Sequence, residues 1–292
     1  MRKILVLRGG ALGDFIVTLP ALALLRTRWP AARIELVGNF TAAALAVDAG
    51  LIDHVHSQHD ARWSALYASA PLPSDLSAEL TQFDLVINFW PDPDGDLARR
   101  FPLQAGQTYL SASALPASPP AAAHYCAPLS ALGLYAPSFH FSLATARPDA
   151  RLIAIHPGSG SAKKNWPLTR WLDLCHWLTH EHRAELLIIT GEADTAAASA
   201  LSAFGTAAHR LPLRDLITRL CHCRLFVGHD SGISHLAAAC GLPSILLFGP
   251  TDPAMWSPPA PQVRVIQHGP TLDEIPLSAV KSALLPEPLA SA

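Results

Sequence analysis

The run Lys3-Ile4-Leu5-Val6-Leu7-Arg8 leads directly into Gly9-Gly10-Ala11-Leu12-Gly13-Asp14, and an apolar stretch interrupted by Pro20 follows from Phe15 to Leu25. A short run with a continuously apolar centre is typical of a strand that is buried on both faces of a parallel sheet. Glycines directly after such a strand favour a tight turn. The stretch therefore predicts a strand, a glycine turn and a helix, the opening unit of a doubly wound α/β fold.

The same alternation continues along the chain. Further buried strands are expected at residues 33–37, 83–89, 152–155, 186–190, 225–228 and 244–248. In the second half, helices are expected after Pro167, near 195–204 and 213–222, and from Ser231 to Cys240. Strands that alternate with helices, twice over, predict an α/β chain with two Rossmann-like, doubly wound domains that face a central cleft.

The division between the two domains is expected in an Ala-, Ser- and Pro-rich region at about 102–150. Such a composition predicts loops and an interdomain connection. The first domain is accordingly expected at 1–145 and the second at 146–292, with a final segment that can pack back on the first domain. A length of 292 residues is comfortable for two domains.

Composition excludes several classes of protein. Hydrophobic residues make up 50% and charged residues 15%, which provides ample material for buried cores and argues against disorder. With a net charge of −2 and no Lys/Arg run longer than two residues, binding of nucleic acid through a basic face is not expected. No uncharged apolar stretch reaches the roughly 18 residues of a membrane span, and the run after Lys3 is too short for a signal peptide. Five cysteines, an odd and low number, fit a reducing compartment, so a cytoplasmic protein is expected.

Chemistry is expected just after the strands, because ligands of such sheets bind outside the carboxyl ends of the strands. The segment Gly228-His229-Asp230-Ser231-Gly232-Ile233-Ser234-His235 passes from a strand into a helix. Its free main-chain N–H groups would suit a pyrophosphate, although the same polar residues could simply cap the helix. Lys163 and Lys164, two of the four lysines, lie in a Gly/Ser-rich loop. They suggest a charge aimed at phosphate, the alternative being a solvated pair.

Arg8 and Asp14 flank the first glycine turn. Asp14 is either the N-cap of the following helix or a general base within reach of an acceptor hydroxyl. Arg8 could hold an anionic group or pair with Asp14. Asp92-x-Asp94-x-Asp96 lacks the glycine and the closing Glu of a calcium loop and predicts a polar turn. Cys221-His222-Cys223 lacks zinc spacing and predicts the end of a helix, so no metal is expected.

Three segments share a pattern with a known family. They are Ile4-Leu5-Val6-Leu7-Arg8 through Gly13-Asp14 with Leu19-Pro20-Ala21-Leu22, then His156-Pro157-Gly158-Ser159 with Lys164-x-Trp166-Pro167, and finally Asp230 to Ala239 with Phe248-Gly249-Pro250-Thr251-Asp252-Pro253. Together they resemble glycosyltransferase family 9, the lipopolysaccharide heptosyltransferases and their relatives. The resemblance implies a GT-B fold, with the acceptor on the first domain and the nucleotide sugar on the second.

Residue by residue, the resemblance implies an inverting transfer that needs neither metal nor cofactor. Asp14 matches the catalytic base, and Lys164 matches the lysine that binds the donor phosphates. Glu192 and Asp194 both remain candidates for the donor-binding carboxylate. The other implied site residues are Ser159, Asp230, Ser231, Gly232, Ile233 and His235 toward the donor, and Arg8 and Gly13 toward the acceptor or a phosphate.

The resemblance also implies substrates and a location. The donor is a nucleotide sugar, with ADP-heptose expected, and the acceptor is a hydroxyl of the lipopolysaccharide core or of a related glycolipid or oligosaccharide. The enzyme would be cytoplasmic, with peripheral contact at the cytoplasmic face of the inner membrane. The first half of the chain is not especially basic, whereas a phosphorylated acceptor would favour several cations, so the acceptor stays open.

Other functions remain as alternatives. One is a sugar-nucleotide epimerase that shares the GT-B fold, and another is a binder of nucleotide sugars without catalysis. A more remote alternative is an α/β-hydrolase that uses Asp230, because Gly228-x-Asp230-x-Gly232 after a strand has the shape of a nucleophile elbow. A hydrolase would need no nucleotide, and an epimerase would need no acceptor.

Overall fold

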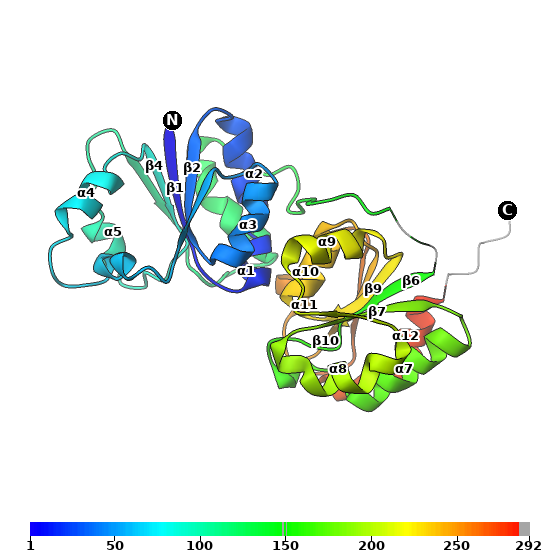
Figure 1. Cartoon of the computed structure of the whole chain (residues 1–292). Helices are drawn as coiled ribbons and strands as arrows, with labels where there is room; N and C mark the ends of the chain where they lie inside the picture. The colour runs from blue at the N-terminus through cyan, green and yellow to red at the C-terminus, as the bar shows by residue number, and fades with distance from the viewer. Residues whose placement is uncertain (148, 150, 286–292) are drawn as a thin grey trace. The chain divides into compact units, whose positions relative to one another are not determined.

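The computed structural model describes residues 1–147, 149 and 151–285. The chain separates into two units, Met1–Phe141 and Ser142–Ala292. The boundary predicted from composition, between residues 145 and 146, lies a few residues further along the chain than the observed one. Each unit has its own parallel sheet with helices on both faces (Figure 1), which confirms the predicted α/β class.

The first sheet grows from the first apolar run of the chain. β1 (Lys3–Arg8) pairs in parallel with β2 (Arg33–Gly38) on one side and with β4 (Leu85–Asn88) on the other. The edge strands β3 (His54–Ser57) and β5 (Thr108–Ser111) complete the order β3-β2-β1-β4-β5. Because all five strands are parallel, the residues that follow them gather at one edge of the sheet.

Helices cover both faces of the first sheet, α1 to α3 on one face and α4 and α5 on the other (Figure 1). The helices of this unit, with short 3₁₀ helices written η, are α1 (Leu12–Ile16), α2 (Leu19–Arg28), α3 (Phe40–Asp48), η1 (Ala61–Leu66), α4 (Ser74–Leu80), α5 (Asp96–Arg100), α6 (Ala121–Cys126) and η2 (Ala127–Leu132). Buried side chains such as Leu5, Val37 and Trp63 fill the space between the sheet and the α4 and α5 face. Burial of this apolar surface is the main force that holds the layers together.

The second sheet has the strand order β11-β10-β9-β6-β7-β8, again wholly parallel. Its strands are β6 (Leu152–Ile155), β7 (Glu185–Thr190), β8 (Thr206–His209), β9 (Leu225–His229), β10 (Ser244–Phe248) and β11 (Val263–Gln267). The strand order makes β6, β9 and β10 neighbours. Their carboxyl ends therefore bring together loops that are far apart in the sequence.

The helices of the second unit also lie in two layers, with α7, α8 and α12 on one face of the sheet and α9 and α10 on the other (Figure 1). They are η3 (Ala162–Lys164), α7 (Leu168–His180), η4 (Glu192–Asp194), α8 (Thr195–Leu201), η5 (Ser202–Phe204), α9 (Leu213–Cys221), α10 (Gly232–Ala239), α11 (Pro253–Trp256), η6 (Leu272–Glu274) and α12 (Leu277–Leu284). α12, from the final segment, packs against α7 in this unit. The rest of that segment, 286–292, lies outside the described residues.

The sequence predicts none of the four edge strands, β3, β5, β8 and β11. Each is only four or five residues long and carries exposed or half-exposed side chains. A strand of this kind lacks the continuous apolar run that marks a central strand. The region at 102–150 is expected to hold only loops and the interdomain connection, but it also contains β5 and α6.

The helix expected from Phe15 to Leu25 is divided into α1 and α2. Pro20 lies in the first turn of α2, where its missing N–H has no helical partner to lose. A proline that interrupts an apolar stretch therefore marks the start of a second helix here.

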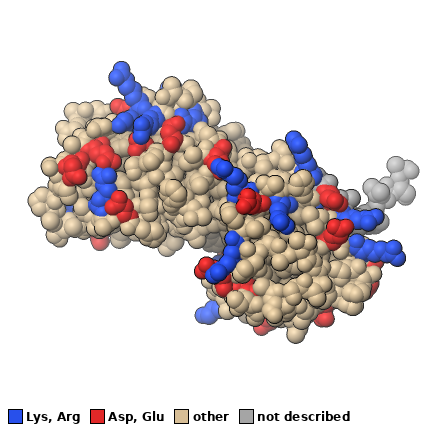
Figure 2. Space-filling view, viewed as in Figure 1, with Lys and Arg blue, Asp and Glu red and all other residues tan. Residues whose placement is uncertain are grey.

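Charged side chains of both signs are interspersed on the face shown in Figure 2, and no single-sign field covers either unit there. Among the described residues, no helix combines the length and the apolar character needed to cross a membrane.

Candidate functional site

Three loops of the second unit meet at Asp230, which follows β9. The Lys164 Nζ, from the loop after β6, lies 2.7 Å from Asp230 Oδ2. Thr251, from the loop after β10, donates its hydroxyl to the same oxygen at 2.8 Å. The Asp230 side chain is 11% exposed and that of Lys164 is 32% exposed. The ammonium group is thus held in place while it still has N–H bonds for another acceptor.

Helix α10 begins immediately after this ion pair. Ser231 is its N-cap, and the Ser231 hydroxyl oxygen accepts the N–H of Ser234 at 3.3 Å. In the described part of the chain, the main-chain N–H groups of Gly232 and Ile233 donate no hydrogen bond. His235 is buried on the same helix. The expected capping is confirmed, and the unpaired N–H groups with the helix dipole leave an arrangement that favours an anion.

His229, the last residue of β9, is wholly buried and ties together the two ends of the lysine loop. Its Nε2 accepts the main-chain N–H of Trp166 at 2.9 Å, so the ring proton lies on Nδ1, 3.3 Å from the Gly158 carbonyl oxygen. Burial, together with the neighbouring His156, lowers the pKa of His229 to about 3. The imidazole is therefore neutral near pH 7. It acts as a bridge that positions the loop carrying Lys164.

The two candidate carboxylates after β7 differ in their surroundings. Glu192 is 79% exposed and forms an ion pair with Arg210 at 2.7 Å. Asp194 accepts the N–H of Gly191 at 2.7 Å and lies against Gly158, where an added Cβ would be only 2.1 Å from Asp194 Oδ1. Gly158 therefore lets the Asp194 carboxylate approach the loop after β6, whereas Glu192 points into solvent.

Ser159 braces the same loop from within. Its hydroxyl oxygen lies 2.7 Å from the carbonyl oxygen of Ser161 and 2.7 Å from Asn165 Oδ1, and the residue is 6% exposed. His156, at the start of the loop, is also buried, and burial lowers the pKa of its ring. Both residues fix the shape of the loop rather than presenting a charge.

A cavity of 570 Å³ opens next to the ion pair, on the loops after β10 and β11. Thr251 lies in its wall and also bonds to Asp230, so the cavity and the Lys164–Asp230 pair share a side chain. Asp252, Gln267 and Gly269 contribute further wall. Its size falls in the range of about 300–1,000 Å³ that is usual for small-molecule sites.

In the first unit, Asp14 lies in the first turn of α1 and is half-buried. It is not the N-cap, which is Ala11; instead Asp14 Oδ2 reaches back and accepts the Ala11 N–H at 2.9 Å. Gly10 has a φ of +99°, and a Cβ there would lie 2.8 Å from the Asp14 Cβ, so only glycine fits this turn. The other carboxylate oxygen, Oδ1, has no hydrogen-bond partner among the described residues. Gly13 precedes Asp14 in the same turn.

Arg8 contacts Asp14, but it bonds to the main chain of Asp14 and not to its carboxylate. Its Nη2 donates to the Asp14 carbonyl oxygen at 2.6 Å, and its Nε donates to the Thr18 hydroxyl at 2.9 Å. The guanidinium also lies over the Tyr125 ring, 4.3 Å from the centroid, and Arg8 is 3% exposed. Arg8 therefore holds the turn that carries Asp14.

The two motifs set aside in the sequence have structural roles. Both carboxylate oxygens of Asp92 accept main-chain N–H groups at the start of α5, from Leu97 and Ala98. Cys221 ends α9 just before β9, as expected. Within the described residues, no group of three or more His, Cys, Asp or Glu side chains is arranged to hold a metal ion.

Sequence reasoning missed two residues that this geometry brings forward. Thr251 and His229 lie inside the segments singled out above, but the sequence alone predicts a role for neither. The only indication for His229 was its place between a strand and the candidate anion site, and for Thr251 its place just after a strand.

Comparisons with known proteins agree with this geometry. The sequence pattern of "Glycosyltransferase family 9 (heptosyltransferase)" matches residues 123–276, more than half of the chain. Lipopolysaccharide heptosyltransferase 2 of Salmonella typhimurium is 30% identical over 137 residues, which are 44% of this chain and 38% of that protein. Lipopolysaccharide heptosyltransferase 1 of Pseudomonas aeruginosa is 32% identical over 114 residues, 38% of this chain and 32% of that protein. The sequence matches thus span well under half of the length of these relatives.

Solved structures show the fold over nearly the whole chain. The family 9 glycosyltransferase of Veillonella parvula aligns with a TM-score of 0.77 at 19% identity, over 97% of this chain and 96% of the other. The E. coli heptosyltransferase WaaC with ADP aligns with a TM-score of 0.76 at 19% identity, over 97% and 98% of the two chains. This likeness confirms the predicted GT-B fold.

Proposed function

This chain belongs to glycosyltransferase family 9, and from that premise we propose that it transfers a sugar, with inversion, from a nucleotide diphosphate donor to a hydroxyl of a lipopolysaccharide-core or related glycan. The observation that carries the proposal is the meeting of Lys164, Asp230 and Thr251 beside the N-terminus of α10. A fixed ammonium group and free main-chain N–H groups at one place are the features that a pyrophosphate needs.

The donor-binding step follows from these contacts. Lys164 and the N–H groups of Gly232 and Ile233 would bind the diphosphate and meet the charge that develops on it as the bond to the sugar breaks. The Asp230 carboxylate, itself negative, would not touch the phosphates; it would hold Lys164 in position. His235 and Ser231 complete this segment of the donor site. ADP-heptose is the donor we expect, supported by the similarity to a heptosyltransferase solved with ADP.

The acceptor step requires a base. Asp14 Oδ1, which no described residue occupies, would take the proton from the acceptor hydroxyl as its oxygen attacks the anomeric carbon. Attack on the face opposite the leaving diphosphate inverts the configuration of that carbon. Arg8 and Gly13 would serve this step by holding the turn and the helix end on which Asp14 lies.

Asp194 is the better candidate for the donor-binding carboxylate. It lies next to the loop after β6, whereas Glu192 is exposed and paired with Arg210. An epimerase or a binder without catalysis would share this donor site, and dependence on an acceptor separates transfer from both. A hydrolase at Asp230 is not favoured, since its carboxylate bonds to Lys164 and Thr251. The same proposal places the enzyme in the cytoplasm, in peripheral contact with the cytoplasmic face of the inner membrane.

A thermal-shift titration with ADP, UDP, GDP and CDP, with and without magnesium, tests the donor site. A ligand at about 100 times its dissociation constant stabilises a protein by about 2.7 kcal/mol, which is a shift of about 5–10 °C at this size. We expect a selective shift with ADP that does not require magnesium. A selective shift with another nucleotide would change the donor, and no shift with any nucleotide would contradict the proposal.

Lys164→Ala should weaken nucleotide binding about 10- to 100-fold, because it removes charge-assisted hydrogen bonds worth about 1.5–3 kcal/mol. Lys163→Ala is the matched control, since Lys163 is the adjacent lysine and is exposed. Isothermal titration with ADP measures both variants. If the two variants lose affinity equally, or if only Lys163→Ala does, the assignment of Lys164 is wrong.

A further inference from the structure

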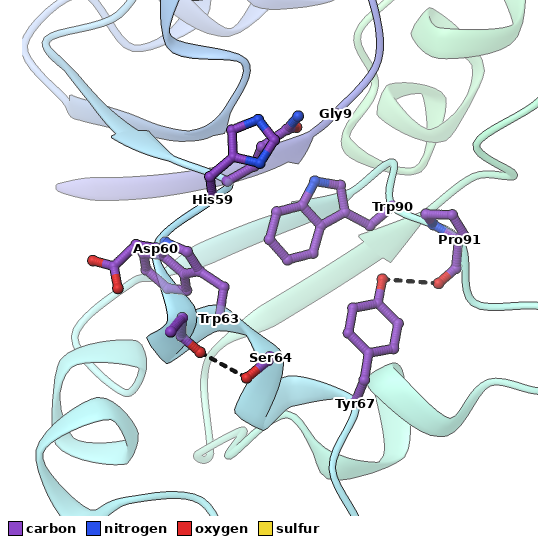
Figure 3. Close-up of a pocket in the computed structure, with 10 residues that line it drawn as sticks. Gly9, His59, Asp60, Trp63, Ser64, Tyr67, Trp90 and Pro91 are labelled. Atoms are coloured by element: carbon purple, nitrogen blue, oxygen red, sulfur yellow. Dashed lines mark hydrogen bonds between the residues drawn. The ribbon is translucent and has the colours of Figure 1, made fainter.

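A second cavity, of 470 Å³, opens in the first unit at the carboxyl edge of its sheet (Figure 3). Its wall includes Gly9 after β1, Gln58 after β3 and Trp90 after β4. Gly9 is followed by Gly10, whose backbone packs against Asp14. The cavity therefore adjoins the turn that holds the proposed base, yet none of the site residues expected from the sequence lines it.

Two aromatic rings form one side of this cavity. The rings of Tyr67 and Trp90 are stacked, with centroids 6.3 Å apart and planes inclined by 23°. The Tyr67 hydroxyl donates to the Pro91 carbonyl oxygen at 3.0 Å, which fixes the ring although Tyr67 is 50% exposed. Figure 3 shows the two rings on one side of the hollow and His59 and Ser64 on the other. Trp90 itself is 7% exposed, so the Tyr67 ring is the face that a flat apolar ligand surface can reach.

The wall also carries polar groups, His59 among them, but no permanent cation. None of its ten residues is Lys or Arg, and Asp60 is among them. Arg62, close in sequence, pairs with Glu79 and lies over the Trp63 ring, 4.9 Å from its centroid. A phosphate or carboxylate in this cavity would therefore face Asp60 without a compensating permanent charge.

Hydrogen-bonding groups for a neutral ligand are available. Across the described ranges of the chain, no hydrogen bond engages the Trp90 indole N–H or the Gln58 side-chain amide, and both residues line the cavity. Hydroxyl groups can both donate to and accept from such partners. The cavity thus combines an aromatic face with a polar rim.

We propose that this cavity binds a neutral pyranose ring of the acceptor glycan, stacked on the Tyr67 ring beside Trp90. The inference rests on the proposed function and names the class of acceptor at that site. A pyranose has an apolar C–H face and a rim of hydroxyl groups, which match the aromatic side and the polar rim of the cavity. The sugar next to the attacked hydroxyl is accordingly an unphosphorylated one.

Saturation-transfer NMR with neutral methyl pyranosides tests this without any turnover. We expect methyl glucoside, galactoside or mannoside to receive saturation from the wild-type chain, and glucose 6-phosphate to bind more weakly than methyl glucoside. Tyr67→Ala should weaken binding about tenfold, because it removes the ring on which the sugar stacks. Tyr67→Phe keeps the ring and should retain most of the affinity. Tyr135→Ala, also in the first unit and 74% exposed, is the control and should change nothing.

Three results would overturn the inference: tighter binding of the phosphorylated sugar, an unchanged affinity in Tyr67→Ala, or no saturation transfer to any neutral pyranoside. The same variants are titrated with ADP. Tyr67→Ala should keep the wild-type response to nucleotide, and a loss there would show that a nucleobase, not a pyranose, occupies the cavity. A wild-type chain that binds pyranosides but no nucleotide would contradict the proposed sugar transfer. It would still support the proposal that this cavity binds a neutral pyranose.

Discussion

Replacing Asp14 by Asn should lower the rate of sugar transfer about 10²- to 10⁴-fold, the usual contribution of a positioned general base. Asn keeps a side-chain oxygen that can still accept the Ala11 N–H, so the turn of α1 should hold its shape. The affinity for the nucleotide should therefore stay that of the wild type. Turnover with an ADP-sugar and titration with ADP alone measure the two effects separately.

Asp75→Asn is a suitable control for this experiment, because Asp75 also lies in the first turn of a helix, α4, and is exposed. It should leave turnover unchanged. A large loss of nucleotide affinity in Asp14→Asn would count against its assignment as the base, as would a turnover close to that of Asp75→Asn.

The second large effect is expected at His229, on stability. His229→Phe keeps a ring against Trp171, whose own ring lies 5.3 Å away, but leaves the Trp166 N–H and the Gly158 carbonyl without their partner. Each buried unsatisfied group costs about 1–3 kcal/mol, so we expect a loss of about 3 kcal/mol in the free energy of unfolding of the second unit. Nucleotide affinity should fall as well, since the loop that carries Lys164 loses its anchor.

The same residue predicts a pH dependence. The pKa of His229 is lowered to about 3 in the folded chain, against about 6.5 in the unfolded chain. Between these two pH values the unfolded chain therefore binds more protons than the folded chain. Stability should therefore fall with acidification, by about 2 kcal/mol from pH 7.5 to pH 5 through His229 alone. The buried His156, whose pKa is also lowered, acts in the same direction.

Urea unfolding at the two pH values tests both statements. His229→Phe should be less stable at pH 7.5 and should lose less on acidification than the wild type. His268→Phe, at an exposed position of the same unit, should behave as the wild type does. Equal pH dependence in wild type and His229→Phe would show that another group titrates.

The central strands could be predicted because each is buried on both faces. Ile4 to Leu7 and Leu246 to Phe248 form continuous apolar runs, and such runs are visible without any knowledge of the neighbours. The edge strands could not be predicted, because an edge strand such as β8 has few apolar residues and depends on hydrogen bonds to one partner. The sequence thus predicts the central strands of both sheets but not their edge strands.

The site shows the same division. The helix start at Ser231 could be predicted, because a cap is a local property of a few consecutive residues. The contact between Lys164 and Asp230, 66 residues apart, depends on β6 and β9 being neighbours in the sheet. Strand order is set by packing of the whole unit, and no local pattern specifies it.

The ion pair between Lys164 and Asp230 also has a consequence for turnover. The diphosphate that leaves carries more negative charge than it did in the donor, so a bare ammonium group would hold the product more tightly than the substrate. With Asp230 beside it, Lys164 exchanges one anionic partner for another when the nucleotide departs. Release of the nucleotide then leaves no unpaired cation behind. Asp230, which positions Lys164 for donor binding, therefore also makes product release easier.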